Sequence, residues 1–219
     1  LEAFAYSIAH DLRAPLASID GFSAVLEESM GTRPERAMHY ASRIRAGVHQ
    51  MSELTDGLLA LANLSRAELR DDSVDLAALA HAAVAQLRES HPQRSVRVTI
   101  APAMPARGDA RLLAQVMGNL VGNAWKFTAR KDDARIEIGI EPGAEGARAY
   151  FVRDNGAGFD MAHAGRMFEA FQRMHSASEF EGTGIGLAIV HKIVTRHGGR
   201  IQAAGAPDAG ATFRFTLGN

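Results

Sequence analysis

The chain has 219 residues, with 24 basic and 25 acidic side chains and a net charge of −1. This balance gives no overall positive field, so we expect no binding of nucleic acid or of an acidic membrane surface. Hydrophobic residues make up 47% of the chain and cysteine is absent, which allows a buried core and excludes disulfides and a thiolate nucleophile. No apolar run reaches the length of about 18 residues that a membrane span needs. We expect a cytoplasmic fragment of a longer protein, attached to a membrane only through an upstream region, if at all.

The first 30 residues have the apolar spacing of an amphipathic helix. His10 lies opposite the centre of the apolar stripe, so we expect it in water beside Asp11. Pro15 removes a backbone donor and bends or loosens the helix near His10. The stripe recurs at steps of three and four and consists of Ile8, Leu12, Pro15, Ile19, Phe22 and Leu26.

A second amphipathic helix follows Gly31, with Pro34 in its first turn. Its short connection to the first helix predicts an antiparallel hairpin. Two such helices cannot bury both stripes against each other, so we expect a homodimer that forms a four-helix bundle. The alternative is that the hairpin packs on the second half of the same chain. The second stripe consists of Ala41, Ile44, Val48, Met51, Leu54, Leu58 and Leu61.

After the polar stretch SRAELRDDS the pattern changes to that of an α+β two-layer sandwich. Asp75 is suited to cap a helix over LAALAHAAVAQLRES, and further helices are expected at about 110–128 and 186–197. Five stretches have the pattern of strands: VRVTI, RIEIGIE, AYFVRD, RIQA and ATFRFTL. We place the hairpin at 1–66, a linker at 67–74 and the sandwich at 75–219. The long irregular segment at about 159–182 is typical of a lid over a site.

Two stretches of the second half place polar groups at regular spacing. In NLVGNAWKF, Asn119 and Asn123 share a helix face and Lys126 lies one turn beyond, which suits Mg²⁺ and phosphate. Caps or a solvated face would explain the same pair. In DNGAGFD, Asp154 ends a strand, and the glycines after it let a planar ligand approach the backbone. A plain glycine turn is the alternative.

Two later stretches belong to the lid and to the helix behind it. In MFEAFQRMH, Phe168 and Phe171 have helical spacing, so we expect them to anchor the lid in the core, with Arg173 able to reach a phosphate. In EGTGIGLAIV, three alternate glycines precede an apolar helix whose first N–H groups form an anion site.

Together these stretches resemble the catalytic core of a bacterial sensor histidine kinase. IAHDLRAPL resembles the H-box, NLVGNAWKF the N-box, DNGAGF the G1 box, MFEAFQRMH the F-box and GTGIGLAIV the G2 box. HDLRAPL and FQRMH are similar to the phytochrome-like branch. The resemblance covers essentially the whole chain. It implies a dimerisation and histidine-phosphotransfer hairpin, followed by an ATP-binding domain of the Bergerat fold that gyrase, Hsp90 and MutL share.

The resemblance also implies roles for single residues in binding ATP and Mg²⁺. Asp154 would accept the adenine amino group, and Asn123 would ligate Mg²⁺ with Asn119 beside it. Lys126 and Arg173 would contact phosphates, together with the backbone of Gly184 and Gly186. Phe127 suits a place near the nucleotide and ordinary core packing equally well. The remaining members of the expected nucleotide-binding set are Gly156, Gly158, Gly182, Thr183 and Leu187.

An imidazole with a carboxylate at one ring nitrogen has its other nitrogen made more nucleophilic. We therefore expect His10 to be the phosphoacceptor and Asp11 its orienting base. The resemblance implies that the phosphoryl group then passes to an aspartate in the receiver domain of a response regulator. One alternative is an ATP-hydrolysing clamp of the gyrase or Hsp90 kind. Those enzymes carry a glutamate where this chain has Asn119, whose amide cannot take a proton from water. The other alternative is a non-catalytic dimerisation scaffold.

The position four residues after His10 bears on the reverse reaction. Family members that dephosphorylate their regulator usually have Thr or Asn there, and this chain has Ala14. Alanine has no group that could hold the attacking water, so we expect weak phosphatase activity. The sequence leaves open the signal, the regulator, and phosphorylation in cis or in trans.

Overall fold

The structure is a computed structural model that describes residues 12, 15–23, 25–26, 34–64, 68–143, 148–176, 179–180 and 182–218. The chain divides into two compact units, Leu1–Ala62 and Asn63–Asn219. The predicted phosphoacceptor His10, its neighbour Asp11 and the phosphatase-related Ala14 lie outside the described residues.

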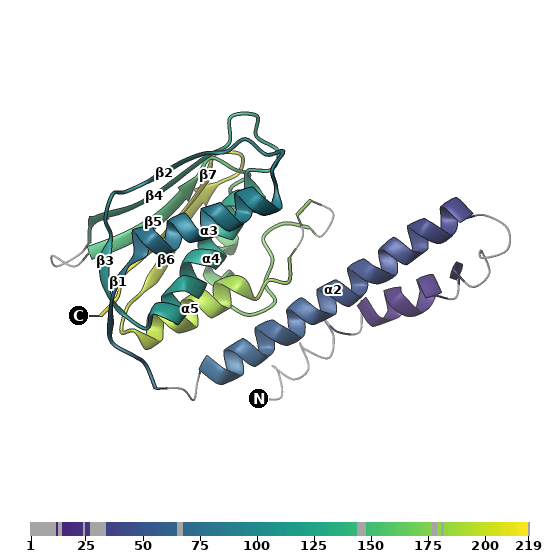
Figure 1. The fold of residues 1–219 in the computed structure, drawn as a ribbon, viewed down its shortest axis with the longest axis horizontal. Helices are drawn as coiled ribbons and strands as arrows, with labels where there is room; N and C mark the ends of the chain where they lie inside the picture. The colour runs from purple at the N-terminus through teal and green to yellow at the C-terminus, as the bar shows by residue number, and fades with distance from the viewer. Residues whose placement is uncertain are drawn as a thin grey trace. The chain divides into compact units, whose positions relative to one another are not determined.

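The first unit is an antiparallel pair of helices, as the sequence predicts. The described part of the first helix, residues 15–23, runs along α2 (Pro34–Leu64) (Figure 1). The ring of Phe22 stacks on Tyr40 with 6.0 Å between centroids. A Cβ atom added at Gly47 would lie 2.8 Å from Cγ1 of Ile19. Residues later in the first helix therefore meet residues earlier in α2, which is the antiparallel order.

Several apolar side chains of the hairpin are exposed within the single chain. Leu16 is 51% exposed, Met38 72% and Val48 54%. Val48 belongs to the stripe that the sequence places in the core, so a single hairpin leaves part of that stripe uncovered. None of the helices in the described residues combines the length and the apolarity that a membrane crossing requires.

The second unit is a two-layer sandwich. Its five-stranded sheet has the order β2-β4-β5-β7-β6, with β2 parallel to β4 and the other neighbours antiparallel. The helices α3, α4 and α5 lie together over one face of the sheet (Figure 1). The elements are β1 (Asp72–Asp75), α3 (Leu76–Ser90), β2 (Arg97–Ile100), β3 (Pro105–Gly108), α4 (Ala110–Phe127), β4 (Arg135–Pro142), β5 (Arg148–Asp154), the 3₁₀ helix η2 (Met161–Arg166), α5 (Gly186–Arg196), β6 (Ile201–Ala206) and β7 (Gly210–Phe215).

The core lies between the helix layer and the sheet. Leu120 of α4 and Ile193 of α5 are fully buried, and Ile138 and Phe215 of the sheet are 1% exposed. The apolar face of each helix is thus turned to the sheet, and the opposite face of α4 remains available for polar side chains.

Asp75 caps α3, as predicted, because its Oδ1 accepts a hydrogen bond from the Ala77 N–H at 3.0 Å. The same oxygen accepts the Met104 N–H at 2.8 Å. The small sheet next to this cap, in which β1 pairs with β3, was not predicted from the sequence. The first three residues of β1, 72–74, fall in the stretch that we assigned to the linker. The sequences of β1 (DSVD) and β3 (PARG) lack the alternating β-branched or aromatic residues that are typical of a strand.

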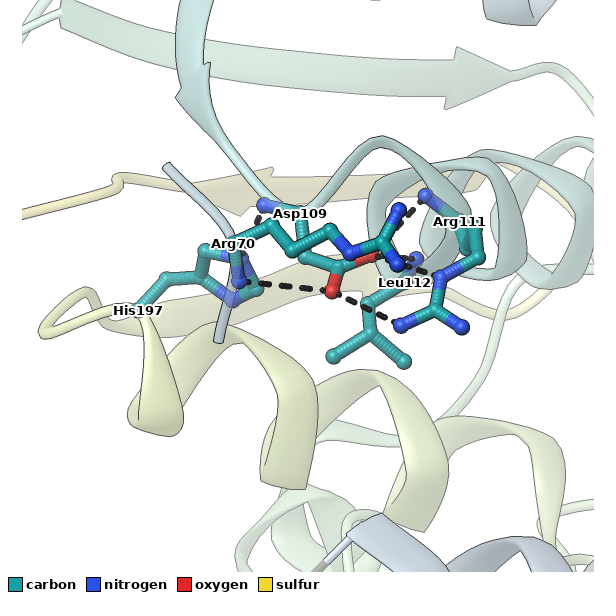
Figure 2. A network of polar contacts seen from close by, with 5 residues as sticks. All are labelled: Arg70, Asp109, Arg111, Leu112 and His197. Atoms are coloured by element: carbon teal, nitrogen blue, oxygen red, sulfur yellow. Dashed lines mark hydrogen bonds and ion pairs between the residues drawn. The ribbon is translucent and has the colours of Figure 1, made fainter. Parts of the chain in front are cut away.

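Asp109, whose carboxylate is buried, joins the start of α4 to the end of α5 (Figure 2). It accepts the backbone N–H groups of Arg111 at 3.1 Å and Leu112 at 3.3 Å, and Nη2 of Arg111 at 3.2 Å. The Asp109 N–H donates to Nε2 of His197 at 3.0 Å, while Nδ1 of His197 lies 2.8 Å from the Ile193 carbonyl. Because Nε2 accepts a hydrogen bond, the ring proton is on Nδ1 and the imidazole is neutral.

These contacts set the ionisation of Asp109. Burial alone would raise the pKa of Asp109, but the hydrogen bonds from Arg111 and from the backbone of Leu112 and Arg70 outweigh it and hold the pKa at about 2. The unfolded value is about 3.9. A lower pKa in the folded state means that the ionised group stabilises the fold above about pH 4. This stabilisation, on the order of 2 kcal/mol, is lost as the pH falls through about 2.

Asp109→Asn should therefore lower the free energy of unfolding at neutral pH by about 2 kcal/mol and flatten its dependence on pH between about 4 and 2. Asparagine is the matched substitution because it still caps a helix but carries no charge. Denaturant unfolding followed by the fluorescence of Trp125, the one tryptophan of the chain and 2% exposed in α4, measures the effect. Equal stability of both proteins at neutral pH would contradict this account.

Candidate functional site

The C-terminal half of α4 is the base of the site. The turns that face the sheet carry Leu120 and Ala124, which are buried. Asn119, Asn123 and Lys126 are half-buried along the same helix. The spacing of the polar residues in NLVGNAWKF therefore gives the row of two amides and one ammonium that the sequence predicts.

The start of α5 lies against this row. Nδ2 of Asn119 donates to the Gln115 carbonyl at 2.8 Å, which turns Oδ1 away from that carbonyl. A Cβ atom added at Gly186, the first residue of α5, would lie 2.5 Å from Oδ1 of Asn119. The residue at the N-cap is Ile185, whose apolar side chain cannot accept the first N–H groups of the helix. An amide oxygen thus faces a helix start that attracts anions.

The glycine loop before α5 reaches the other end of the row. A Cβ atom added at Gly182 would lie 3.0 Å from Nζ of Lys126. The Gly184 carbonyl accepts the Phe171 N–H at 3.1 Å, which joins this loop to the lid. Thr183 and Leu187, which also belong to the predicted set, are half-buried and neighbour these glycines in the chain.

The loop after β5 meets α4 at Phe127. The Ala157 N–H donates to the Phe127 carbonyl at 3.1 Å, and a Cβ atom added at Gly156 would lie 2.5 Å from that oxygen. Gly158 has a φ of 61°, and a side chain there would collide with the Ala206 carbonyl. Only glycine fits this turn, so the loop has a fixed course past the end of α4.

Asp154 is the buried acid of the site. It is 7% exposed, and its Oδ1 accepts the Gly156 N–H at 2.8 Å. Burial raises the pKa of Asp154 to about 6, against the lowering effect of backbone hydrogen bonds from Gly156 and Ala211. The carboxylate is therefore ionised at neutral pH and can accept a hydrogen bond from an amino group such as that of adenine.

The lid differs from its predicted form. Phe168 and Phe171 do not share a helix face, because Phe171 has a φ of 68°, far from helical values. Both are half-buried, so neither is the core anchor we predicted. The buried residues in the described part of the lid are Phe159, 6% exposed, Met167, 2% exposed, and Phe180, 8% exposed. The Phe168 ring stacks instead on His191 of α5, with 5.7 Å between centroids.

The predicted phosphate contact Arg173 lies within the lid, and its Nη2 donates to the Phe180 carbonyl at 2.6 Å. Arg130 reaches the same segment, with Nη2 donating to the Glu179 carbonyl at 3.0 Å. Sequence reasoning missed Arg130, Phe180 and His175 as residues that hold the lid. Of these three, only His175 had a signal in the sequence, because it is the last residue of the motif MFEAFQRMH.

The predicted residues are thus largely brought together around one end of α4. The loops at 156–158 and 182–186 contact Phe127, Lys126 and Asn119. Amide oxygens are ligands that Mg²⁺ accepts, so the half-buried Asn123 could hold the ion. The Asn119 oxygen is directed at the start of α5, which favours an anion. Within the part of the chain that the structure describes, no cluster of three acidic or histidine side chains offers another metal site.

Two known domain families match the two units. Residues 108–219 match the family described as histidine kinase-, DNA gyrase B-, and HSP90-like ATPase. Residues 1–67 match the His Kinase A (phospho-acceptor) domain. A phosphoacceptor domain is thus followed by an ATPase-type sandwich. The chain belongs to the sensor histidine kinase family, as the resemblance predicted.

Individual relatives support the same assignment. Cyanobacterial phytochrome B from a Nostoc species is 35% identical over 222 residues, which are 99% of this chain and 29% of that protein. The histidine kinase ThkA in complex with the response regulator TrrA shares the fold, with a TM-score of 0.75 and 19% identity over 98% of this chain and 60% of that one. Full-length ShkA in complex with AMPPNP gives a TM-score of 0.65 and 26% identity over 97% of this chain and 44% of that one.

Proposed function

We propose that this chain is a protein-histidine kinase that transfers the γ-phosphoryl group of Mg·ATP to His10. The observation that carries the proposal is the convergence of Asn119, Lys126 and the two glycine loops at one end of α4, beside the buried Asp154. The adenine amino group would donate to Asp154, and the phosphates would lie toward Lys126 and the start of α5. The ATP analogue in the ShkA structure supports a nucleotide ligand.

In the proposed reaction, the His10 ring nitrogen away from Asp11 attacks the γ-phosphorus. A nitrogen–phosphorus bond forms, the bond to the bridging oxygen breaks, and ADP leaves. Asp11 accepts the hydrogen bond from the other ring nitrogen and stabilises the positive charge that develops. Lys126 and Arg173 would neutralise phosphate charge. Asn123 would hold Mg²⁺, with Asn119 beside it, and the bound ion would neutralise further phosphate charge.

The ATPase-clamp alternative is the less supported one, because the position of the water-activating glutamate is held by Asn119. Its Nδ2 donates to the Gln115 carbonyl, and an amide cannot act as a general base. The kinase proposal is tested by incubating the chain with Mg·ATP labelled in the γ-phosphate. An acid-labile, base-stable phosphoprotein is expected. Hydrolysis of ATP without a phosphoprotein would favour the clamp, and no response to Mg·ATP at all would favour the scaffold.

We also propose that the chain is a homodimer through the hairpin. Leu16, Met38 and Val48 are exposed apolar side chains on helices of one chain, and a second hairpin would cover them in a four-helix bundle. The receiver domain of a response regulator is the proposed second partner, in line with the regulator bound to ThkA. Because ATP is the proposed substrate, we place the reaction in the cytoplasm. The domain boundaries 1–66, 67–74 and 75–219 remain our proposal.

Ala14 should limit dephosphorylation of the regulator. Mixed with phosphorylated regulator and ADP, the unphosphorylated chain should speed the decay of phospho-aspartate only slightly over regulator alone. Ala14→Thr and Ala14→Asn should accelerate the decay several-fold, because each supplies a group that holds the attacking water. The phospho-regulator remaining with time is measured, with His10→Gln as the background that cannot take the phosphoryl group back. Fast decay with the natural Ala14 in that background would contradict the prediction.

A further inference from the structure

We infer that His175 is a positioning residue of the nucleotide site, which ties the lid to the loop after β5 and to the end of α4. This inference rests on the proposed nucleotide-binding function. The mechanism proposed above makes no use of His175, which is half-buried.

The first contact is a hydrogen bond to the loop after β5. Nε2 of His175 lies 2.8 Å from the Gly158 carbonyl oxygen. A carbonyl only accepts, so Nε2 carries a proton and donates it, in the neutral and in the charged imidazole alike. The acceptor is fixed, because Gly158 is buried and its left-handed turn has no room for a side chain. One end of the lid is therefore bound to a rigid point four residues after Asp154.

The second contact is a cluster of three rings formed by Phe127, His175 and Phe180. His175 lies 5.1 Å from Phe127 and 5.1 Å from Phe180, and Phe127 lies 5.0 Å from Phe180, all between centroids. Such distances are those of favourable aromatic pairs. Each ring thus touches both others, and the lid is packed on the last residue of α4.

Arginine side chains hold the far side of this cluster. The Arg130 guanidinium lies 5.0 Å from the centre of the Phe180 ring and donates to the Glu179 carbonyl. Arg173 donates to the Phe180 carbonyl. Arg130 and Arg173 therefore hold the ring and the carbonyl of Phe180, respectively. His175 contacts the same ring and connects it to the loop at Gly158.

The link to the reaction passes through Phe127. The Lys126 ammonium lies 4.4 Å from the centre of the Phe127 ring, within the range of a cation–π contact. His175 and Phe180 of the lid hold the Phe127 ring in place, and this ring in turn contacts the ammonium of Lys126, the proposed phosphate contact. His175 thereby influences the phosphate side of the site through Phe127, and the adenine side through the loop that follows Asp154.

Three variants separate the two contacts of His175. His175→Phe keeps a ring without the donor, His175→Gln keeps a donor without the ring, and His175→Ala removes both. The control is His81→Ala, which removes an exposed histidine of α3. In the full chain without nucleotide, backbone hydrogen–deuterium exchange in residues 167–176 should be fastest in His175→Ala, intermediate in His175→Phe and His175→Gln, and unchanged in His81→Ala.

With Mg·ATP, His175→Ala should raise the Kd for the nucleotide and the KM for autophosphorylation by about 5- to 20-fold, with a smaller change in kcat. His175→Phe and His175→Gln should each recover part of this loss. Lid exchange in His175→Ala equal to that of His81→Ala would overturn the inference. Faster exchange with unchanged Kd and KM would also overturn it, since His175 would then serve the lid alone. Failure of the wild-type chain to bind Mg·ATP would instead refute the proposed function. The exchange experiment would still test whether His175 holds the lid.

Discussion

Substitution of His10 by glutamine is expected to abolish autophosphorylation while leaving ATP binding unchanged. Glutamine fills similar space but its amide nitrogen is not a nucleophile, so no nitrogen–phosphorus bond can form. The incorporated γ-phosphate, measured in an acid-labile form, should fall to background. The Kd for Mg·ATP should stay at its wild-type value, because the nucleotide site lies in the other unit. Residual labelling of the His10→Gln protein would show that another residue is the phosphoacceptor.

A complementary variant makes this result sharper. Asn123→Ala should lose the Mg²⁺-dependent reaction but retain His10 as an acceptor. Mixed dimers of the two variants then report on the direction of transfer, provided that subunit exchange is shown separately. Recovered labelling means transfer between subunits, and no labelling means transfer within one.

Removal of the buried carboxyl of Asp154 is expected to weaken ATP binding strongly. Loss of a charged hydrogen-bond acceptor costs about 1.5–3 kcal/mol, which is about 10- to 150-fold in Kd. Asp154→Ala should show this loss in a nucleotide titration, with the fold checked by circular dichroism. Unchanged affinity in a folded variant would remove Asp154 from the site.

The same residue predicts a pH dependence of binding and of stability, with opposite signs. With a pKa of about 6, Asp154 is protonated below that pH and accepts less well, so the Kd for ATP should rise as the pH falls through about 6. Because the folded pKa lies above the unfolded value, the ionised group destabilises the fold at neutral pH, by an amount on the order of 2 kcal/mol. Asp154→Asn should therefore unfold at higher denaturant concentration than the wild type while binding ATP more weakly.

Asp154→Asn is also the control for the nucleotide itself, since a terminal phosphate titrates near the same pH. The pH profile of the wild type minus that of Asp154→Asn isolates the carboxyl. If the two profiles coincide in shape, the dependence belongs to the phosphate. We expect Asp154→Asn to be more stable than the wild type and to bind ATP more weakly. This combination would show that the buried carboxyl serves binding and lowers stability.

What the sequence alone determined is the part that short-range spacing encodes. The strand and helix patterns predicted the five strands of the sheet and its three helices, because neighbouring residues of each element carry its pattern. The helical spacing of Asn119, Asn123 and Lys126 predicted a polar row, since residues three or four apart share a face in any α-helix. Asp75 was predicted as a cap for the same reason, because capping depends on the next two or three residues.

The tertiary structure decided everything that depends on segments far apart in the chain. The hydrogen bond between Asp109 and His197 joins residues 88 positions apart, and no local pattern around either residue predicts it. The raised pKa of Asp154 and the lowered pKa of Asp109 come from burial and from the hydrogen bonds that accompany it, which the same residue type does not reveal in sequence. In the lid, Phe171 has a left-handed backbone and its N–H bonds the Gly184 carbonyl, while His175 contacts Phe127 and Gly158. The helical spacing of the motif encodes none of these contacts. Local patterns determine which helices and strands form. The packing of those elements determines which polar groups are buried and which hydrogen-bond partners they have.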